Sequence, residues 1–270
     1  MNGYDRAVTG PSLEPILRVR APSVADFSRR FFVPRRPVVV EGALEGWPAL
    51  ATWSGPALAS RFGDRRVSVY EMRKGRVRLS RAAGFVVAPS TVAEVVERVG
   101  AGGGDAPFLR AALPGALPEL LEDVAPPPYC ALGGGLRQNL WYCAAGAITD
   151  CHFDLPDNLV ACVRGRKRFF VFSPEQGKNL YRRPLASSVP HLAEVDLAAP
   201  DTARFPRLAR ARGVEAVLAP GDLLYLPPRA WHFAEALEET ISINFWFARP
   251  LSAVLLAASD LYKRVRALRI

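Results

Sequence analysis

Three residues in two separate stretches of the sequence have the types and spacing of a metal site. His152 and Asp154 are two residues apart, so a β-strand places both side chains on one face and Phe153 on the other. A histidine and a carboxylate on one face are two of the three ligands of a 2-His-1-carboxylate triad, which binds non-haem Fe(II). His232, in GDLLYLPPRAWHF, is the candidate third ligand. The alternative for a lone histidine is a half-buried side chain hydrogen-bonded to the backbone, but the three residues together favour the metal site.

Lys167 is the next residue whose position suggests chemistry. It follows a turn at Arg164 and Gly165 and begins the strand-like run KRFFVF, in which Lys167, Phe169 and Val171 share one face. A lysine on an otherwise apolar face is costly to bury without an anionic partner, and a dicarboxylate cosubstrate would be such a partner. The alternative is a lysine at the end of a strand that reaches solvent.

Asn244 lies in a strand-like stretch with two different faces. In ISINFWF, residues 241–247, the odd positions are uniformly apolar and are expected to pack against the core, while Ser242, Asn244 and Trp246 face the other way. A strand with one apolar and one polar-aromatic face could line a pocket. The third histidine, His191, lies in the proline-containing stretch SSVPHLAEVD and is interpreted as a loop residue.

The first hundred residues alternate between short helices and strands. Capping residues predict three helices, and apolar runs predict two strands. The expected elements are a helix from Ser23 through Phe31, a strand at 37–40, a helix from Ser54 to Gly63, a strand near 66–71, and a helix from Ser90 or Thr91 that stops at Gly100.

From 136 to 247 the pattern is strand-rich, with glycine and proline at the turns. Many short strands separated by such turns predict a mainly β fold with flanking helices, of jelly-roll type. In the segment from Leu251 to Ile270, apolar residues at helical spacing predict a terminal helix packed on the domain, with a homodimer contact as the alternative.

We expect one domain over residues 1–270, because the glycine- and proline-rich runs are too short to act as free linkers. It would comprise N-terminal strands and helices over 1–135, a core jelly roll over 136–247 and a C-terminal helix over 248–270.

Bulk composition excludes several classes of protein. Half of the 270 residues are hydrophobic, so a sizeable core can form and global disorder is excluded. The N-terminus lacks the features of a signal peptide, and no apolar run approaches the roughly 18 residues that span a bilayer. The four cysteines show no CxxC spacing and are interpreted as reduced thiols. Together these features predict a cytoplasmic protein without membrane association.

The formal net charge of +9 raises the question of a nucleic-acid partner. Nearly all of the positive charge is arginine in an alanine-, glycine- and proline-rich chain, a composition that genomic base bias produces as readily as selection for a basic surface. No dense block of Lys and Arg with interleaved aromatic residues occurs. A nucleic-acid partner is therefore not favoured.

Four blocks of the sequence resemble the JmjC/cupin-like family of Fe(II)- and 2-oxoglutarate-dependent oxygenases. They are RRPVVVEGALEGWPALATWS, HFDLPDNLVACVRGRKRFFVFSPEQGKNLY, PGDLLYLPPRAWHFAEAL and SINFWF. The blocks follow the family's order and spacing, and the likeness extends over most of the chain. It is similar to the small protein-hydroxylase branch, typified by the asparaginyl hydroxylase of hypoxia-inducible factor. The resemblance implies a double-stranded β-helix (jelly-roll, cupin-like), with Fe(II), 2-oxoglutarate as cosubstrate and O₂.

The resemblance carries over to this chain residue by residue. It implies that His152, Asp154 and His232 are the iron ligands and that Lys167 pairs with the distal carboxylate of 2-oxoglutarate. Thr149, three residues before the first histidine, matches a hydroxyl residue that assists this lysine.

Two further matches and one departure concern the cosubstrate. Asn158 and Asn244 match amides near 2-oxoglutarate. The family's usual tyrosine for the distal carboxylate corresponds here to Phe108, which removes one hydrogen bond and weakens cosubstrate binding by about 0.5–1.5 kcal/mol. Tyr142 is the candidate substitute for that hydroxyl.

The resemblance implies an oxygenase that hydroxylates a protein or peptide side chain and releases succinate and CO₂. One alternative keeps the same chemistry but moves the substrate to RNA or a small metabolite. A second alternative is a non-catalytic cupin binding module, for which the departure at Phe108 is the only support.

Overall fold

The structure is a computed structural model, and it describes residues 10–80 and 84–249. The predicted C-terminal helix and the homodimer contact assigned to it fall on residues 250–270, outside the described part of the chain. Within the described residues, no helix has the length and apolar character needed to cross a membrane.

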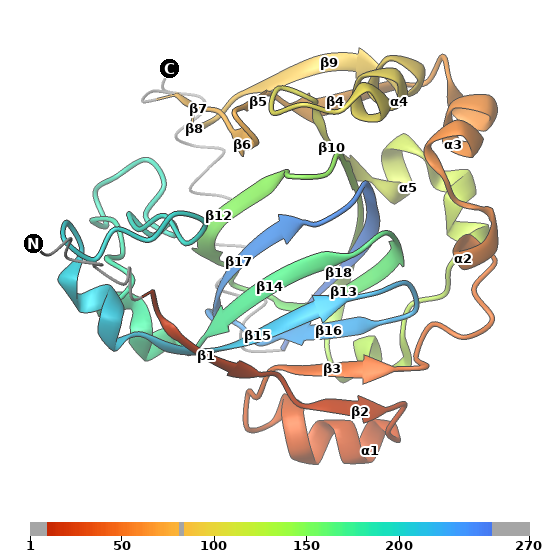
Figure 1. Ribbon diagram of the computed structural model, residues 1–270. Coiled ribbons are helices and arrows are strands. Elements are labelled where there is room, and N and C mark those ends of the chain that lie inside the picture. The colour runs from red at the N-terminus through yellow and green to blue at the C-terminus, as the bar shows by residue number, and fades with distance from the viewer. Residues whose placement is uncertain (1–9, 81–83, 250–270) are drawn as a thin grey trace, which may run out of the picture.

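Two large β-sheets face each other and form the body of the fold (Figure 1). The first has the strand order β1-β15-β14-β17-β12-β6-β5, and the second has the order β2-β3-β16-β13-β18-β11-β10-β4-β9, while β7 and β8 form a separate pair. The strands of the first sheet are β1 (Ser12–Pro15), β5 (Met72–Arg73), β6 (Arg76–Val77), β12 (Ile148–Phe153), β14 (Lys167–Phe172), β15 (Arg212–Leu218) and β17 (Trp231–Ala236). Those of the second are β2 (Arg18–Arg20), β3 (Val38–Glu41), β4 (Arg66–Tyr70), β9 (Val87–Thr91), β10 (Phe108–Ala112), β11 (Gly134–Cys143), β13 (Asp157–Arg164), β16 (Leu223–Leu226) and β18 (Thr240–Ala248). The separate pair is β7 (Leu79–Ser80) and β8 (Gly84–Phe85).

The strands β11 to β18 make the centre of the fold. Four of them, β12, β14, β15 and β17, are neighbours in the first sheet, and β11, β13, β16 and β18 are neighbours in the second. All pairings within each group of four are antiparallel, so the chain crosses back and forth between two facing sheets. This arrangement is a double-stranded β-helix, and the predicted jelly-roll fold is confirmed.

The helices flank this core. They are α1 (Val24–Phe27), α2 (Ala49–Thr52), α3 (Gly55–Phe62), α4 (Val92–Ala101) and α5 (Leu113–Ala116). Ser23 and Ser54 cap α1 and α3 as predicted, and Thr91 forms a capping box with Glu94 at the start of α4. The predicted stop of α4 at Gly100 is wrong: the helix continues to Ala101 and ends where Gly102 takes a φ of 70°, which glycine adopts at little cost.

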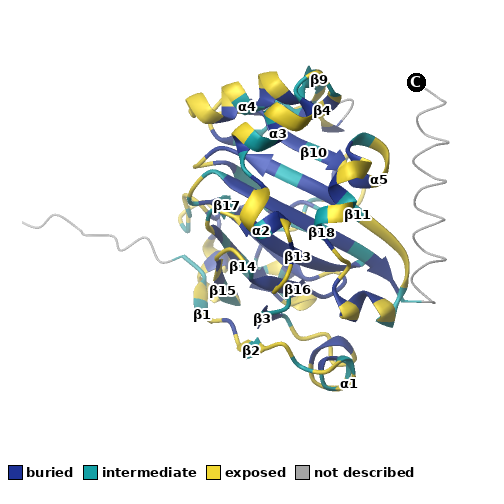
Figure 2. Cartoon of the chain, turned by 90° about the vertical axis from the view of Figure 1, so that its right-hand side faces the viewer, coloured by how far each residue is buried: buried dark blue, intermediate teal, exposed yellow. Residues whose placement is uncertain are grey.

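Apolar side chains form layers around and between the sheets. The largest lies between the second sheet and the helices, and Figure 2 shows α2, α3 and α5 in front of that sheet. Ile241, Ile243 and Phe245 of β18 belong to this layer, as their alternation predicts. A second layer, which includes Phe169 and Val171, lies between the two sheets, and a third covers the outer side of the first sheet. The inner faces of both sheets therefore surround one interior.

A buried ion pair joins β13 to the end of β18. Asp157 is 1% exposed, and the Arg249 guanidinium donates to its carboxylate at 3.1 and 3.2 Å, while the Tyr225 hydroxyl donates to it at 2.6 Å. Burial, followed by the neighbouring Asp157, raises the pKa of Tyr225, which therefore stays protonated and remains a donor. The network therefore ties β13, β16 and the residue after β18 together through charged and hydroxyl groups.

We expect Asp157→Ala to lower the free energy of unfolding by about 3 kcal/mol, because Arg249 would be left largely buried without its partner. Urea denaturation monitored by circular dichroism measures this value. The matched control is Glu45→Ala, which breaks an exposed pair with Arg20 and should cost less than about 1 kcal/mol. Equal losses in the two variants would contradict the prediction.

Candidate metal centre

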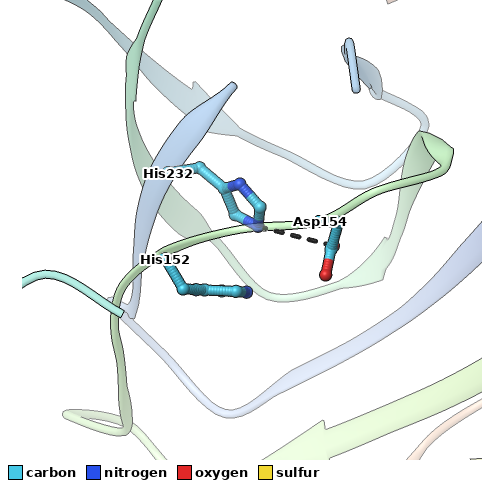
Figure 3. Close-up of side chains that lie close together, drawn as sticks. All are labelled: His152, Asp154 and His232. Carbon is cyan, nitrogen blue, oxygen red and sulfur yellow. Dashed lines mark ion pairs between the residues drawn. The ribbon is translucent and has the colours of Figure 1, made fainter. Parts of the chain in front are cut away.

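The three predicted metal ligands converge at one point inside the jelly roll. His152 of β12 and His232 of β17 are direct register partners on adjacent strands, and their ring centroids are 4.1 Å apart. Asp154 follows the end of β12, and its Oδ2 atom lies 3.8 Å from Nε2 of His232. Figure 3 shows the three side chains pointing toward one another. All of their candidate ligand atoms lie within 4.8 Å of each other.

The hydrogen bonds of both imidazoles prepare their Nε2 atoms to bind a metal. Nδ1 of His152 is 2.8 Å from the carbonyl oxygen of Asp150, and Nδ1 of His232 is 3.0 Å from that of Ala230. Because a carbonyl oxygen only accepts, each Nδ1 carries a proton, and this tautomer of the neutral ring leaves the lone pair on Nε2 for a metal. Desolvation, reinforced by the neighbouring His232, lowers the pKa of His152 to about 4, so this ring is neutral at pH 7.

This donor set fits an Fe(II) ion. Two neutral imidazole nitrogens and one carboxylate oxygen are the ligands of the facial triad that leaves other coordination positions open. At metal–ligand distances of about 2.1 Å, two neighbouring ligands at right angles lie about 3.0 Å apart. The spacing of 3.8 Å between Asp154 and His232, and of up to 4.8 Å among the three ligand atoms, is wider than this, so the side chains would move closer together when they bind an ion.

Two asparagines support the carboxylate of the triad. The side-chain amide of Asn158 lies 3.4 Å from Oδ2 of Asp154, and Asn244 donates to Asn158 Oδ1 at 3.0 Å. The backbone N–H of Arg229 donates to the carbonyl oxygen of Asp154 at 2.7 Å. Asn158 and Asn244, which the family resemblance marks as cosubstrate amides, thus form a relay on β13 and β18 that ends at Asp154.

A β-bulge sets the direction of Thr149. Thr149 pairs with Ala234, while His152 pairs with His232, so three steps along β12 oppose two steps along β17. Residues three apart on a regular strand face opposite sides, but the extra residue brings Thr149 and His152 to the same inner face. Thr149 therefore faces the interior beside Ala234 of β17. On β17, Ala234 lies between His232 and Ala236, and Ala236 is the register partner of Lys167.

Lys167 is enclosed inside the jelly roll. It is 6% exposed, and its ammonium group lies over the rings of Phe108 and Phe169, 5.5 and 5.8 Å from their centroids. No carboxylate among residues 10–80 and 84–249 forms an ion pair with it. The alternative of a lysine that reaches solvent is therefore wrong. A buried cation without an anionic partner among these residues fits the carboxylate of a small dicarboxylate ligand.

Further polar atoms on the same inner faces lack a partner. The amide nitrogen of Asn139 on β11 and the hydroxyl of Ser242 on β18 are buried, and neither has a hydrogen-bond partner in the described structure. Asn139 lies two residues before Trp141 on β11, and Ser242 is the register partner of Trp141 on β18. Such atoms cost free energy unless a ligand or water satisfies them, which again fits a polar ligand in the interior.

The proposed role of Tyr142 as a substitute for the missing tyrosine is wrong. On β11, Trp141 and Cys143 face the interior, so alternation directs Tyr142 to the opposite side, where it joins the layer beneath the helices. Its hydroxyl is the atom that a Cβ on Gly55 of α3 would meet first. Burial, followed by the nearby Glu239, raises the pKa of Tyr142.

Three inner residues carry no motif that marks them in the sequence. Arg110 of β10, Asn139 and Trp141 all lie on inner faces, and their only signal is alternation with apolar neighbours, as in FLRAA and QNLWYC. His191 does not join the triad; its ring lies 6.2 Å from that of Phe85 on β8. The interpretation of His191 as a loop residue agrees with its place outside the named strands.

Comparisons with known proteins place this geometry in a family. The family model for the cupin-like domain matches residues 24–253. Lysine-specific demethylase 8 of Xenopus tropicalis is 31% identical over 243 residues, which cover 86% of this chain and 53% of that protein. The human bifunctional peptidase and (3S)-lysyl hydroxylase JMJD7 is 28% identical over 84% of this chain and 82% of that protein. The tRNA wybutosine-synthesizing protein 5 of Danio rerio is 30% identical over 82% of this chain and 71% of that protein.

The chain spans about half the length of the demethylase that it matches. The region that the family model matches nevertheless contains the strands from β3 to β18, the triad and Lys167. The chain therefore belongs to the JmjC/cupin-like family of Fe(II)- and 2-oxoglutarate-dependent oxygenases.

Proposed function

We propose that this chain is an Fe(II)- and 2-oxoglutarate-dependent hydroxylase that acts on a side chain of a protein or peptide. One observation carries the proposal: the interior that holds His152, Asp154 and His232 also holds the buried ammonium group of Lys167, which has no carboxylate partner in the described part of the chain. A metal site and a carboxylate site in one interior are the two halves of a site for a cosubstrate that bridges them. The names of two relatives, lysine-specific demethylase 8 and the (3S)-lysyl hydroxylase JMJD7, refer to lysine, which supports a protein substrate.

The side chains would divide the work as follows. Nε2 of each histidine and the carboxylate of Asp154 would hold Fe(II), which with 2-oxoglutarate and O₂ supplies the oxidising power to hydroxylate a C–H bond. Lys167 would neutralise the distal carboxylate of 2-oxoglutarate, and Thr149 would donate a hydrogen bond beside it. The Asn244–Asn158 relay would hold Asp154 in place, because an amide hydrogen bond restrains the rotation of the carboxylate.

The remaining elements of the proposal concern the whole chain. We propose a single domain over residues 1–270 and a cytoplasmic location, supported by four cysteines that are free and buried. RNA is the second substrate class to test, because a tRNA-modifying enzyme is among the relatives.

Purified protein loaded with Fe(II) is expected to convert 2-oxoglutarate to succinate and CO₂, with faster turnover when a substrate peptide is present. Succinate formation followed by NMR, against peptide, RNA and metabolite panels, measures both rates. A protein that binds no iron under anaerobic conditions and forms no succinate would overturn the proposed function.

We expect Phe108→Tyr to strengthen cosubstrate binding. The Phe108 ring lies 5.5 Å from the Lys167 ammonium, so a hydroxyl on this ring would be placed beside the same carboxylate. One added hydrogen bond is worth about 0.5–1.5 kcal/mol, which lowers the KM for 2-oxoglutarate by roughly two- to tenfold. The matched control is Phe169→Tyr, which adds a hydroxyl to the other ring beside Lys167. An equal decrease in KM for that variant would show that the effect does not depend on position 108.

A further inference from the structure

Arg110 lies between two tryptophan rings on the inner face of the second sheet. It occupies the middle of β10 and is the register partner of Trp141 on β11. Its guanidinium carbon is 5.5 Å from the ring centroid of Trp141 and 5.2 Å from that of Trp246 on β18. The two indoles thus hold the guanidinium by cation–π contacts and fix its position.

The charge of Arg110 has no anionic partner in the described structure. One of its terminal nitrogens donates to the Tyr70 hydroxyl at 3.0 Å, and no carboxylate among the described residues forms an ion pair with it. The indole N–H groups of Trp141 and Trp246 are also buried without an acceptor. This part of the interior is therefore rich in donors and short of acceptors, which favours an anionic ligand group.

Contacts link Arg110 to the side of the interior that holds the metal ligands. Trp246, which contacts Arg110, is the register partner of Asn158, whose amide reaches Asp154. Lys167 instead contacts Phe108, two residues before Arg110 on the same face of β10. The two cations therefore have different neighbours, and the Lys167 end remains for the cosubstrate while Arg110 is available to a second anionic group.

We propose that Arg110 selects an acidic side chain, aspartate or glutamate, in the substrate polypeptide; this inference rests on the proposed function. A substrate lysine or arginine would meet the positive charge that Trp141 and Trp246 already hold in place. The planar guanidinium matches one carboxylate in a bidentate pair. Nucleic acid binding depends on many phosphate contacts, whereas this site offers one enclosed guanidinium.

The test uses the full chain loaded with Fe(II) and 2-oxoglutarate. Capped heptapeptide pools, each with one residue type fixed at one position in turn, are scored for hydroxylated product by mass spectrometry. Pools with fixed Asp or Glu are expected to react at least about tenfold faster than pools with the isosteric Asn or Gln, because the amide lacks the charge that Arg110 meets.

Variants separate recognition from a structural role. Arg110→Gln should abolish the preference for pools with fixed Asp or Glu over those with Asn or Gln, and Arg110→Lys should keep part of that preference. Arg110→Glu should shift the preference to pools with fixed Lys or Arg. Because a ratio is compared within each variant, a general loss of activity does not imitate the effect. Arg20→Gln, an exposed arginine paired with Glu45, is the matched control and should leave the ratio unchanged.

Two results would overturn the inference: wild-type protein that converts 2-oxoglutarate but shows no acid-over-amide preference, and Arg110→Gln protein that retains the preference. Hydroxylation of an RNA oligonucleotide that depends on Arg110, without any peptide product, would also overturn it. Failure of the wild type to convert 2-oxoglutarate would instead refute the proposed function. In that case, binding of the same pools, followed by tryptophan fluorescence, decides whether Arg110 recognises acidic side chains.

Discussion

Asp154→Ala is expected to abolish both Fe(II) binding and succinate formation, and His152→Ala and His232→Ala are expected to do the same. The three ligand atoms lie within 4.8 Å of one another, so each supplies one of only three protein bonds to the ion. Loss of a partner outside the ligand set already costs about 10–100-fold in metal affinity, so loss of a ligand should cost at least that much. Metal content after anaerobic loading, and succinate formed per protein, measure the two effects.

His191→Ala is the matched control for the histidine variants, because it removes the remaining histidine of the chain, which lies outside the triad. It should bind iron as the wild type does. If Asp154→Ala retained full iron binding and ligand affinity, the triad would not be a metal centre, and the binding-module alternative would be preferred.

Lys167→Met is expected to act in opposite directions on binding and on stability. Without the ammonium group the distal carboxylate of 2-oxoglutarate would be buried unpaired, and losing one partner of a buried charge pair costs about 2–5 kcal/mol. The dissociation constant for 2-oxoglutarate should therefore rise at least about thirtyfold. The ligand-free protein should melt at a higher temperature, because methionine removes a cation that is 6% exposed and has no carboxylate partner among the described residues.

Thermal unfolding with and without 2-oxoglutarate measures both effects in one experiment. The wild type should be stabilised by the ligand, since a ligand that binds only the folded state raises the melting temperature. Lys167→Met should start higher and gain little. Lys178→Met, which removes an exposed lysine, should resemble the wild type in both respects. A ligand-free Lys167→Met protein that melts lower would show that the cation–π contacts with Phe108 and Phe169 outweigh the cost of burial.

Much of the site could be predicted from local pattern, because strand alternation depends only on neighbouring residues. The shared face of His152 and Asp154, the inward face of Lys167, Phe169 and Val171, and the turn at Gly165 all follow from a period of two and from glycine's freedom at positive φ. The same rule predicted the two faces of β18. The jelly roll follows from many short strands separated by glycine and proline turns.

Other features depend on contacts that local pattern does not encode. The direction of Thr149 depends on a bulge, which appears only in the register of β12 against β17. The residue type of Tyr142 suggests a contact with the cosubstrate, yet alternation on β11 directs its side chain toward the helices once Trp141 and Cys143 face inward. The position of Arg110 depends on three strands that meet only in the folded sheet.

By itself, the sequence of this protein determined which residue types are available, the period of each strand and hence the set of side chains that face inward. The tertiary structure alone decided which of those side chains meet, because strand register and the crossing between two sheets bring together residues far apart in the chain. The ring centroids of His152 and His232 are 4.1 Å apart although 79 residues separate the two histidines in the sequence. Only the pairing of β12 with β17 brings them together.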